Sequence, residues 1–118
     1  MIARTHRFHG RASIQRVYKG GKLARSAYVS LRYMANPKAD SYRLAVVVSK
    51  KVSKKAVVRN RIRRRIYEHV RILFGPQPNP PIPYDFLLTV FDERLATLPA
   101  SELAQEINKV FKKAGLGG

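Results

Sequence analysis

The fold is decided by the stretch "RLAVVVSKKVSKKAVVRNRIRRRIYEHVRILF", residues 43–74, because its apolar pattern changes period. Residues 44–48 are continuously apolar and mostly β-branched, which is typical of a strand buried on both faces. From position 58 onward, apolar residues recur every three or four positions, which predicts a long helix over residues 56–74. The stretch therefore predicts a central strand followed by an amphipathic helix.

Other elements are predicted on both sides of this stretch. Upstream, "ASIQRVYKGG" predicts a short helix that ends at two glycines able to adopt the left-handed conformation. The alternating "AYVSLRYM" predicts a strand, which we expect to form a hairpin with the strand of residues 44–48. Downstream, "GPQPNPPIP", residues 75–83, predicts a stiff proline-rich connection. "YDFLLTVF" predicts another strand, and residues 99–115 predict a final helix closed by Gly115.

The order of these elements favours one α+β domain over residues 1–118, an α/β sandwich with helices packed on a single sheet. The strand ending near Ser49 and the strand beginning at Tyr84 are joined through a long helix, which is what a parallel crossover needs. Such a crossover is right-handed by default. Residues 1–10 are expected to form a mobile N-terminal segment.

The charge is high and uneven. The formal net charge is +17, and the first 71 residues carry 20 of the 24 lysines and arginines but only two of the seven acids. A surface of this kind is stabilised by a polyanion, and nucleic acid fits best because neutralised phosphates release counterions. No apolar run approaches the roughly 18 residues of a membrane span. The absence of cysteine and of a visible secretory signal favours a cytoplasmic protein without disulfides.

The helix over residues 56–74 would present its cations away from its apolar stripe. Ile62 belongs to the stripe and would seat the helix on the sheet, whereas Asn60 offers both a donor and an acceptor to a base edge, a ribose or a phosphate. A charge run is ordinarily a solvated face, but here Glu68 is the only acid, so repulsion is unrelieved and nucleic-acid contact is favoured. The predicted RNA-binding residues are Lys50, Lys51, Lys54, Lys55, Arg59, Asn60, Arg61, Arg63, Arg64 and Arg65.

No catalytic constellation is visible. His6, His9 and His69 have no serine or carboxylate spacing that suggests a triad, and two imidazoles alone would leave half of a zinc site unfilled. Asp85 stands near a strand start, where a structural role is expected. We therefore expect no catalytic residue, no metal site and no cofactor bound by the protein alone.

At this point the motif "VVSKKVSKKAVVRNRIRRRIYE", residues 47–68, resembles the signature of the bacterial ribonuclease P protein subunit. "IQRVYKGGK", "YDFLLTVF" and "SELAQEINKVFKKAG" are similar to that family's first helix, last strand and last helix. The resemblance implies a four-stranded sheet with three helices in the order α-β-β-β-α-β-α. It also implies a left-handed βαβ crossover, in place of the right-handed default, as in the second domain of a small-subunit ribosomal protein.

The same resemblance implies a function. The protein would be the accessory subunit of an endoribonuclease whose catalytic RNA carries the active site and its Mg²⁺, and it would need no obligate protein partner. It would bind that RNA and hold the 5′ leader of precursor tRNA. The residues that match the family's RNA-contacting motif are Lys50, Lys51, Arg59, Asn60, Arg61, Arg63 and Arg64. A departure occurs at Asp92 and Glu93, where the family often carries basic residues.

The leader is expected in a cleft between the first helix and the sheet, lined by aromatic side chains on which bases stack. Tyr18 takes one of the family's two aromatic positions in that helix, and Ile14 takes the other, where only apolar contact remains. Tyr28 or Tyr33 would supply the strand's aromatic ring; alternatively, these tyrosines belong to the core. The predicted cleft residues are Ile14, Tyr18, Tyr28, Tyr33, Val46 and Val48.

A different class of protein has the same charge and size. A ribosomal or other structural RNA-binding protein would also carry an arginine-rich helix. Such a protein has no need of an aromatic groove beside that helix, so the groove separates the two interpretations.

Overall fold

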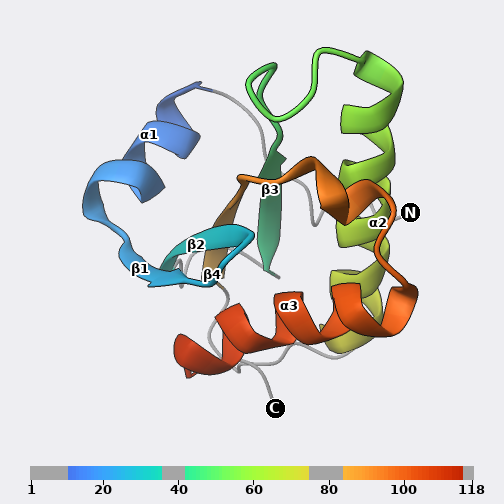
Figure 1. Ribbon diagram of the computed structural model, residues 1–118. Coiled ribbons are helices and arrows are strands. Elements are labelled where there is room, and N and C mark those ends of the chain that lie inside the picture. Colours follow the sequence, from blue (N-terminus) through green and yellow to red (C-terminus); the bar gives the residue numbers. More distant parts are fainter. Residues whose placement is uncertain (1–10, 36–41, 75–83, 116–118) are drawn as a thin grey trace.

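The computed structural model describes residues 11–35, 42–74 and 84–115 (Figure 1). The elements are α1 (Arg11–Gly20), β1 (Lys22–Arg25), β2 (Val29–Ala35), β3 (Arg43–Val47), α2 (Ala56–Phe74), β4 (Tyr84–Val90), the short 3-10 helix η2 (Glu93–Ala96) and α3 (Ala100–Lys113). The predicted α+β class and the long helix over residues 56–74 are confirmed. The predictions for residues 1–10 and 75–83 lie outside the described residues.

The sheet has four strands in the order β1-β2-β4-β3. β2 runs antiparallel to both β1 and β4, and β3 runs parallel to β4, with Leu44 opposite Phe86. The parallel crossover through α2 is therefore confirmed, while its left-handed sense stays a prediction. The expected hairpin between β2 and β3 is wrong, because β4 lies between them, and β3 is an edge strand instead of a central one.

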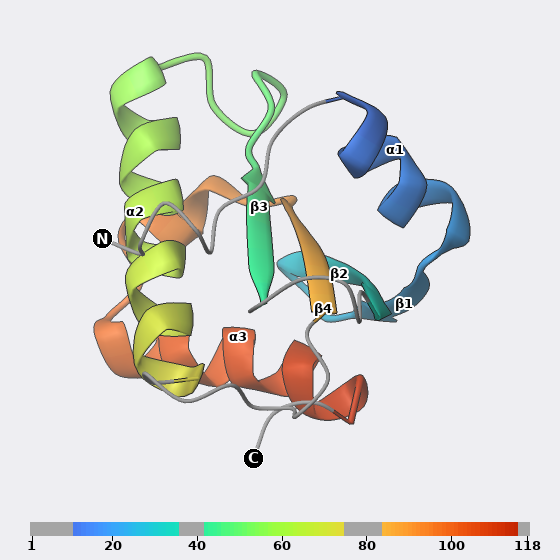
Figure 2. The same ribbon diagram turned by 180° about the vertical axis from the view of Figure 1, so that it is seen from behind.

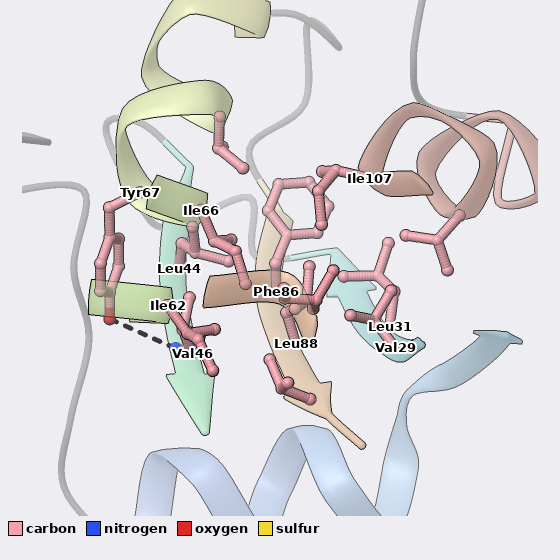
Figure 3. Close-up of a cluster of buried hydrophobic side chains, with 14 of the residues drawn as sticks. Val29, Leu31, Leu44, Val46, Ile62, Ile66, Tyr67, Phe86, Leu88 and Ile107 are labelled. Atoms are coloured by element: carbon pink, nitrogen blue, oxygen red, sulfur yellow. Dashed lines mark hydrogen bonds between the residues drawn. The ribbon is translucent and has the colours of Figure 1, made fainter. Parts of the chain in front are cut away.

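The helices cover opposite faces of the sheet. α1 lies alone on one face, and α2 and α3 lie on the other (Figure 2). The main core fills the α2–α3 side, where the side chains drawn in Figure 3 meet between the helices and the strands. Its largest fully buried members include Leu31, Leu44, Ile62, Ile66, Phe86, Leu88, Ile107 and Phe111. Under α1 the described residues form a small cluster, made by Val17, Ala45 and Leu87 with Met34 against it.

α2 also protects the open edge of β3. The Val46 amide donates a hydrogen bond to the Tyr67 hydroxyl at 3.2 Å, drawn as the dashed line in Figure 3, and Arg63 donates to the Val48 carbonyl at 3.5 Å. At the opposite edge, Lys113 donates to the Arg25 carbonyl of β1 at 2.8 Å. Unpaired groups on an edge strand are templates for aggregation, so these side chains close the sheet at both ends.

The two glycines after α1 have a different role from the predicted one. Among the described residues only Gly115, after α3, has a positive φ (76°), which confirms Gly115 as the cap of the last helix. Gly21 has an ordinary φ, but a Cβ there would lie 2.5 Å from the Val17 carbonyl oxygen and 2.9 Å from that of Tyr33. Glycine at position 21 therefore allows α1 to approach β2 closely.

Replacing Tyr67 by phenylalanine tests the link between α2 and β3. The ring would stay in the core, but the buried Val46 amide would lose its acceptor, which costs about 1–3 kcal/mol. We expect the free energy of unfolding to fall by that amount in urea denaturation. Tyr84→Phe is the control, since its half-buried hydroxyl has no partner among the described residues, and it should change stability by less than about 0.5 kcal/mol. Equal losses in the two variants would contradict the assignment.

Candidate nucleic-acid interface

The lysines predicted to bind RNA lie in the loop between β3 and α2. The loop is held by its own backbone, since the Ser49 carbonyl accepts hydrogen bonds from the amides of Val52 and Ser53 at 3.1 and 3.5 Å. The buried Ser53 hydroxyl accepts a hydrogen bond from the Lys55 amide at 3.3 Å, just before α2 begins. The loop therefore presents its side chains from a fixed backbone, and Lys50, Lys51, Lys54 and Lys55 are all exposed.

The arginines of α2 divide into two groups. Arg61 and Arg64 are exposed, lie with Val57 around a shallow hollow, and make no hydrogen bond or ion pair with the described part of the chain. Arg59 instead donates to the Ser53 carbonyl at 2.9 Å, which ties the helix to the loop before it. Arg61 and Arg64 are therefore the cations best placed to meet a phosphate.

Arg65 is a tie between elements, which changes its predicted role. Its guanidinium donates to the Leu95 carbonyl at 2.6 Å and to the Leu98 carbonyl, so it joins α2 to η2 and the turn after it. Burial, and then the charge of Arg61, lower the pKa of Arg65. Arg65 also lines the hollow beside Arg61 and Arg64, so its contact with RNA stays a prediction next to this structural role.

Asn60 also differs from its prediction. Its Oδ1 accepts a hydrogen bond from Arg63 at 2.7 Å, one helical turn away, and Arg63 reaches the Val48 carbonyl as well. One lone pair of the Asn60 Oδ1 is therefore used within the helix to orient a guanidinium, while its N–H groups and the second lone pair remain able to meet a partner. Sequence reasoning could not separate these cases, because the same spacing serves both.

One further cation of α2 is neutralised on the surface. Arg71 donates twice to the Glu68 carboxylate, and this bonding lowers the pKa of Glu68 to about 2 and raises that of Arg71. The single acid of α2 is thus bonded to Arg71.

On the other face of the sheet, Tyr18 is the exposed aromatic residue of α1. Its side chain is 57% exposed, and the Arg32 guanidinium lies over its ring at 4.3 Å from the centroid. The same guanidinium donates to the Tyr18 carbonyl at 3.0 Å. Tyr18 is therefore held from one side by an arginine, as the sequence did not predict. The side chain of Ile14 lies outside the described residues.

The remaining predicted cleft residues lie elsewhere. Val46 and Val48 are 7% and 4% exposed in the core on the α2–α3 side, so placing them in a cleft beside α1 is wrong. Tyr28 and Tyr33 pack against the same core, with Tyr33 6.2 Å from the Tyr84 ring. For Tyr33 and Val46 the physical reason is strand alternation, which gives the α1 side to the other parity of β2 and β3. The residues of that parity include Ser30, Arg32, Met34, Ala45 and Val47.

The acidic turn after β4 is part of the local structure. Asp92 caps η2 by accepting a hydrogen bond from the Arg94 amide at 2.9 Å, and it pairs with the Arg94 side chain at 2.7 Å. These hydrogen bonds hold the pKa of Asp92 below its usual value, so the stabilisation is present above that value and is lost as pH falls through the lowered one. The charge of Asp92 is therefore paired with that of Arg94. The Cζ atom of Arg94 also lies 5.0 Å from the centroid of the Tyr28 ring.

Other polar residues have structural surroundings. Asp85 is fully buried and accepts two hydrogen bonds from Arg43, at 2.9 and 2.8 Å, in agreement with its expected structural role. His69 contacts Asn108 across α2 and α3 at 2.9 Å, whereas His6 and His9 lie outside the described residues. The described residues hold no group of three or more potential metal ligands. None of the helices that the structure describes has the length and apolar character needed to cross a membrane.

Comparison with known proteins gives one consistent result. A family model described as ribonuclease P matches residues 2–115. A ribonuclease P protein component from a Synechocystis strain is 31% identical over 115 residues, covering 98% of this chain and 90% of that protein. One from Thermus brockianus is 37% identical over 107 residues, covering 91% of this chain, and the chain spans 59% of the length of that protein.

Solved structures resemble the fold. The ribonuclease P protein of Staphylococcus aureus matches with a TM-score of 0.81 at 24% identity, covering 96% of this chain and 98% of that one. The ribonuclease P protein of Thermotoga maritima matches with a TM-score of 0.75 at 22% identity, covering 95% and 98%. Both support the four-stranded sheet with its three helices.

Two alanine variants test the division of the arginines. Arg65→Ala removes hydrogen bonds from a charged group to the carbonyls of Leu95 and Leu98, so we expect it to lower the free energy of unfolding by about 2 kcal/mol. Arg61→Ala, on the exposed side of the same helix, should change stability by less than about 0.5 kcal/mol. Chemical denaturation measures both. An Arg61→Ala variant as unstable as Arg65→Ala would show that the division is wrong.

Proposed function

The chain belongs to the ribonuclease P protein family, and on that premise we propose that it is the protein component of a ribonuclease P ribonucleoprotein that matures the 5′ ends of tRNAs. The observation that supports this role is the outer face of α2, where Arg61 and Arg64 remain without partners among the described residues beside four exposed lysines. A polyanion as large as an RNA subunit would relieve that charge.

The protein's part in the reaction is electrostatic. The RNA subunit would carry the active site, and Mg²⁺ bound by that RNA would supply the activated water for cleavage. The cations of α2 and of the loop before it would neutralise phosphates of the RNA, so that less Mg²⁺ is needed to hold RNA and substrate together. Asn60 would contribute by fixing the Arg63 guanidinium, and Arg59 by fixing the loop.

The 5′ leader of precursor tRNA would lie on the α1 side of the sheet. Tyr18 offers an exposed ring, and the Arg32 guanidinium covers one side of it, so a base would stack on the other. Next to α1, the sheet presents Val47, which is 37% exposed, where the sequence had suggested Val46 and Val48. Base–aromatic stacking is worth about 1–3 kcal/mol and tolerates any base, which suits leaders of differing sequence.

Reconstitution tests the proposed function. Added to a bacterial ribonuclease P RNA with precursor tRNA, the protein should lower the Mg²⁺ concentration that gives half-maximal 5′ cleavage at physiological salt, because its cations replace metal ions at phosphates. A structural RNA-binding protein of the ribosome would have no such effect. No change in cleavage at any Mg²⁺ concentration would overturn the proposal.

The variant Arg61→Ala/Arg64→Ala tests the outer face of α2 by its binding to the RNA subunit, with Arg71→Ala as the matched control. If both arginines contact phosphates, the slope of log K against log salt for RNA-subunit binding should fall by about 2. Arg71→Ala removes one arginine from the same helix, but one already bonded to Glu68, and should leave the slope nearly unchanged.

Tyr18→Ala tests the leader site. We expect it to weaken binding of precursor tRNA by about 1–3 kcal/mol and to leave mature tRNA unaffected, because only the precursor has a leader to stack. Arg32→Ala should weaken precursor binding less, by about 0.5–1 kcal/mol, and should add little to Tyr18→Ala in the double variant, since it acts through the ring. Binding of the two tRNAs to the assembled holoenzyme measures both. Equal losses for precursor and mature tRNA would rule out a leader site at Tyr18.

A further inference from the structure

A second hollow lies between the loop before α2 and the region of η2, where it shares Lys54 and Lys55 with the cationic surface described above. It has a volume of about 500 Å³. Neither Arg61 nor Arg64 lines it, and neither does Tyr18. Its lining is Ser53, Lys54, Lys55, Val58, Glu93, Arg94, Ala96 and Thr97.

Two segments distant in sequence form its walls, and both are fixed. On one side, Arg59 holds the Ser53 carbonyl at 2.9 Å, so the backbone from which Lys54 and Lys55 project is anchored to α2. On the other side, Arg65 bonds to the Leu95 carbonyl at 2.6 Å, which anchors η2 to the same helix. The hollow is therefore a fixed feature of the fold, because Arg59 and Arg65 hold its two walls by hydrogen bonds to backbone carbonyls.

Its charge favours an anion. Lys54, Lys55 and Arg94 line the hollow with the acid Glu93, and Asp92 pairs with Arg94, so the excess positive charge comes from the two exposed lysines. Arg94 is 65% exposed, yet its guanidinium is held in place by Asp92 at 3.0 and 2.7 Å and by the Tyr28 ring. The first turn of α2, which borders the hollow, also contains no acidic residue. A pre-oriented guanidinium loses little entropy when it binds a phosphate.

The rest of the lining suits more than a bare phosphate. Val58 and Ala96 provide an apolar surface between the cations, and the Thr97 hydroxyl, which donates to the Arg94 carbonyl at 3.3 Å, has lone pairs left to accept. Ligand sites typically span about 300–1,000 Å³, and 500 Å³ falls in the range that holds a nucleotide.

We propose that this hollow binds one nucleotide of an RNA strand, with the phosphate at Lys54, Lys55 and Arg94 and the ribose or base against Val58 and Ala96. The hollow would then be a third RNA contact. It borders α2 and includes no residue of α1. The RNA can be the RNA subunit or the precursor tRNA, which present the same chemistry.

The first test uses the protein alone, and so does not depend on the proposed function. In an NMR titration at low salt, adenosine 5′-monophosphate should shift the amide signals of residues 53–55 and 93–97 saturably, and before those of Arg61 and Arg64. Adenosine should produce no saturable shift, and inorganic phosphate should shift the same residues at higher concentration. Shifts spread evenly over all basic residues would overturn the site.

Variants sharpen this titration. Arg94→Ala should weaken adenosine 5′-monophosphate binding about tenfold, the loss expected when a charged hydrogen bond is removed. Lys54→Ala, which disturbs no described contact, provides a second variant if Arg94→Ala unfolds, and it should also weaken binding. Arg71→Ala is the matched control and should bind normally. If neither Arg94→Ala nor Lys54→Ala changes the affinity, the proposal is wrong.

A second test identifies which RNA binds. Unlike the titration, it rests on the proposed function. The chain contains no cysteine, so Thr97→Cys introduces a unique attachment point for a short photocrosslinker. In the reconstituted holoenzyme it should crosslink to a discrete position of the RNA subunit or of the precursor tRNA, whereas Gln105→Cys, exposed on α3, should not. Crosslinks to neither RNA in an active holoenzyme would overturn the site while leaving the proposed function intact.

Discussion

The packing of α2 against β3 and β4 is the contact on which the rest of the structure depends. Ile62, Ile66 and Val70 are fully buried on the sheet, and each such side chain contributes about 1.5–3 kcal/mol of transfer free energy. Like charges one turn apart on a helix cost only about 0.2–0.5 kcal/mol per pair. The apolar stripe therefore outweighs the repulsion of the arginines and lets α2 carry a dense cationic face without acids beside it.

That packing also sorts arginines that look alike in the sequence. Where a backbone carbonyl lies within reach of α2, as for Arg59 and Arg65, the guanidinium becomes a structural tie. Arg61 and Arg64 point away from every neighbouring element that the structure describes, and so keep their donors. Structural ties and the proposed RNA contacts are thus two uses of one residue type, separated by position around the helix. The ties in turn set the distance between the loop before α2 and η2.

Sequence patterns predicted the elements well and their neighbours less well. The period change at residue 56 marked α2, and the apolar stripe of α3 marked its buried face. The sheet order was not predictable, because a buried edge strand and a central strand have the same composition: residues 44–48 look central since α2 covers β3 and Tyr67 closes its edge. The cleft residues failed for a related reason, as one step along a strand moves a side chain to the other face, and Val46 belongs to the core while Ala45 faces α1. Alternation along β2 places Arg32 on the side of the sheet that α1 covers. The contact of its guanidinium with the Tyr18 ring cannot be predicted from that pattern.

The outer face of α2 and the surface around Tyr18, the two surfaces proposed to meet RNA, would act through different interactions, because their cations have different surroundings. On α2 the arginines are exposed, so their attraction acts over a Debye length, about 8–10 Å, and weakens with salt. At Tyr18 the Arg32 charge is already engaged with a ring and a carbonyl, so what this surface offers is the face of an aromatic ring, which acts only in contact and depends little on salt. Under the proposed function, affinity for RNA as a polyanion and discrimination of a single-stranded segment would therefore be carried on opposite faces of one sheet. Each can change without disturbing the other, because the sheet between them is held by the buried side of α2 and not by either RNA-facing surface.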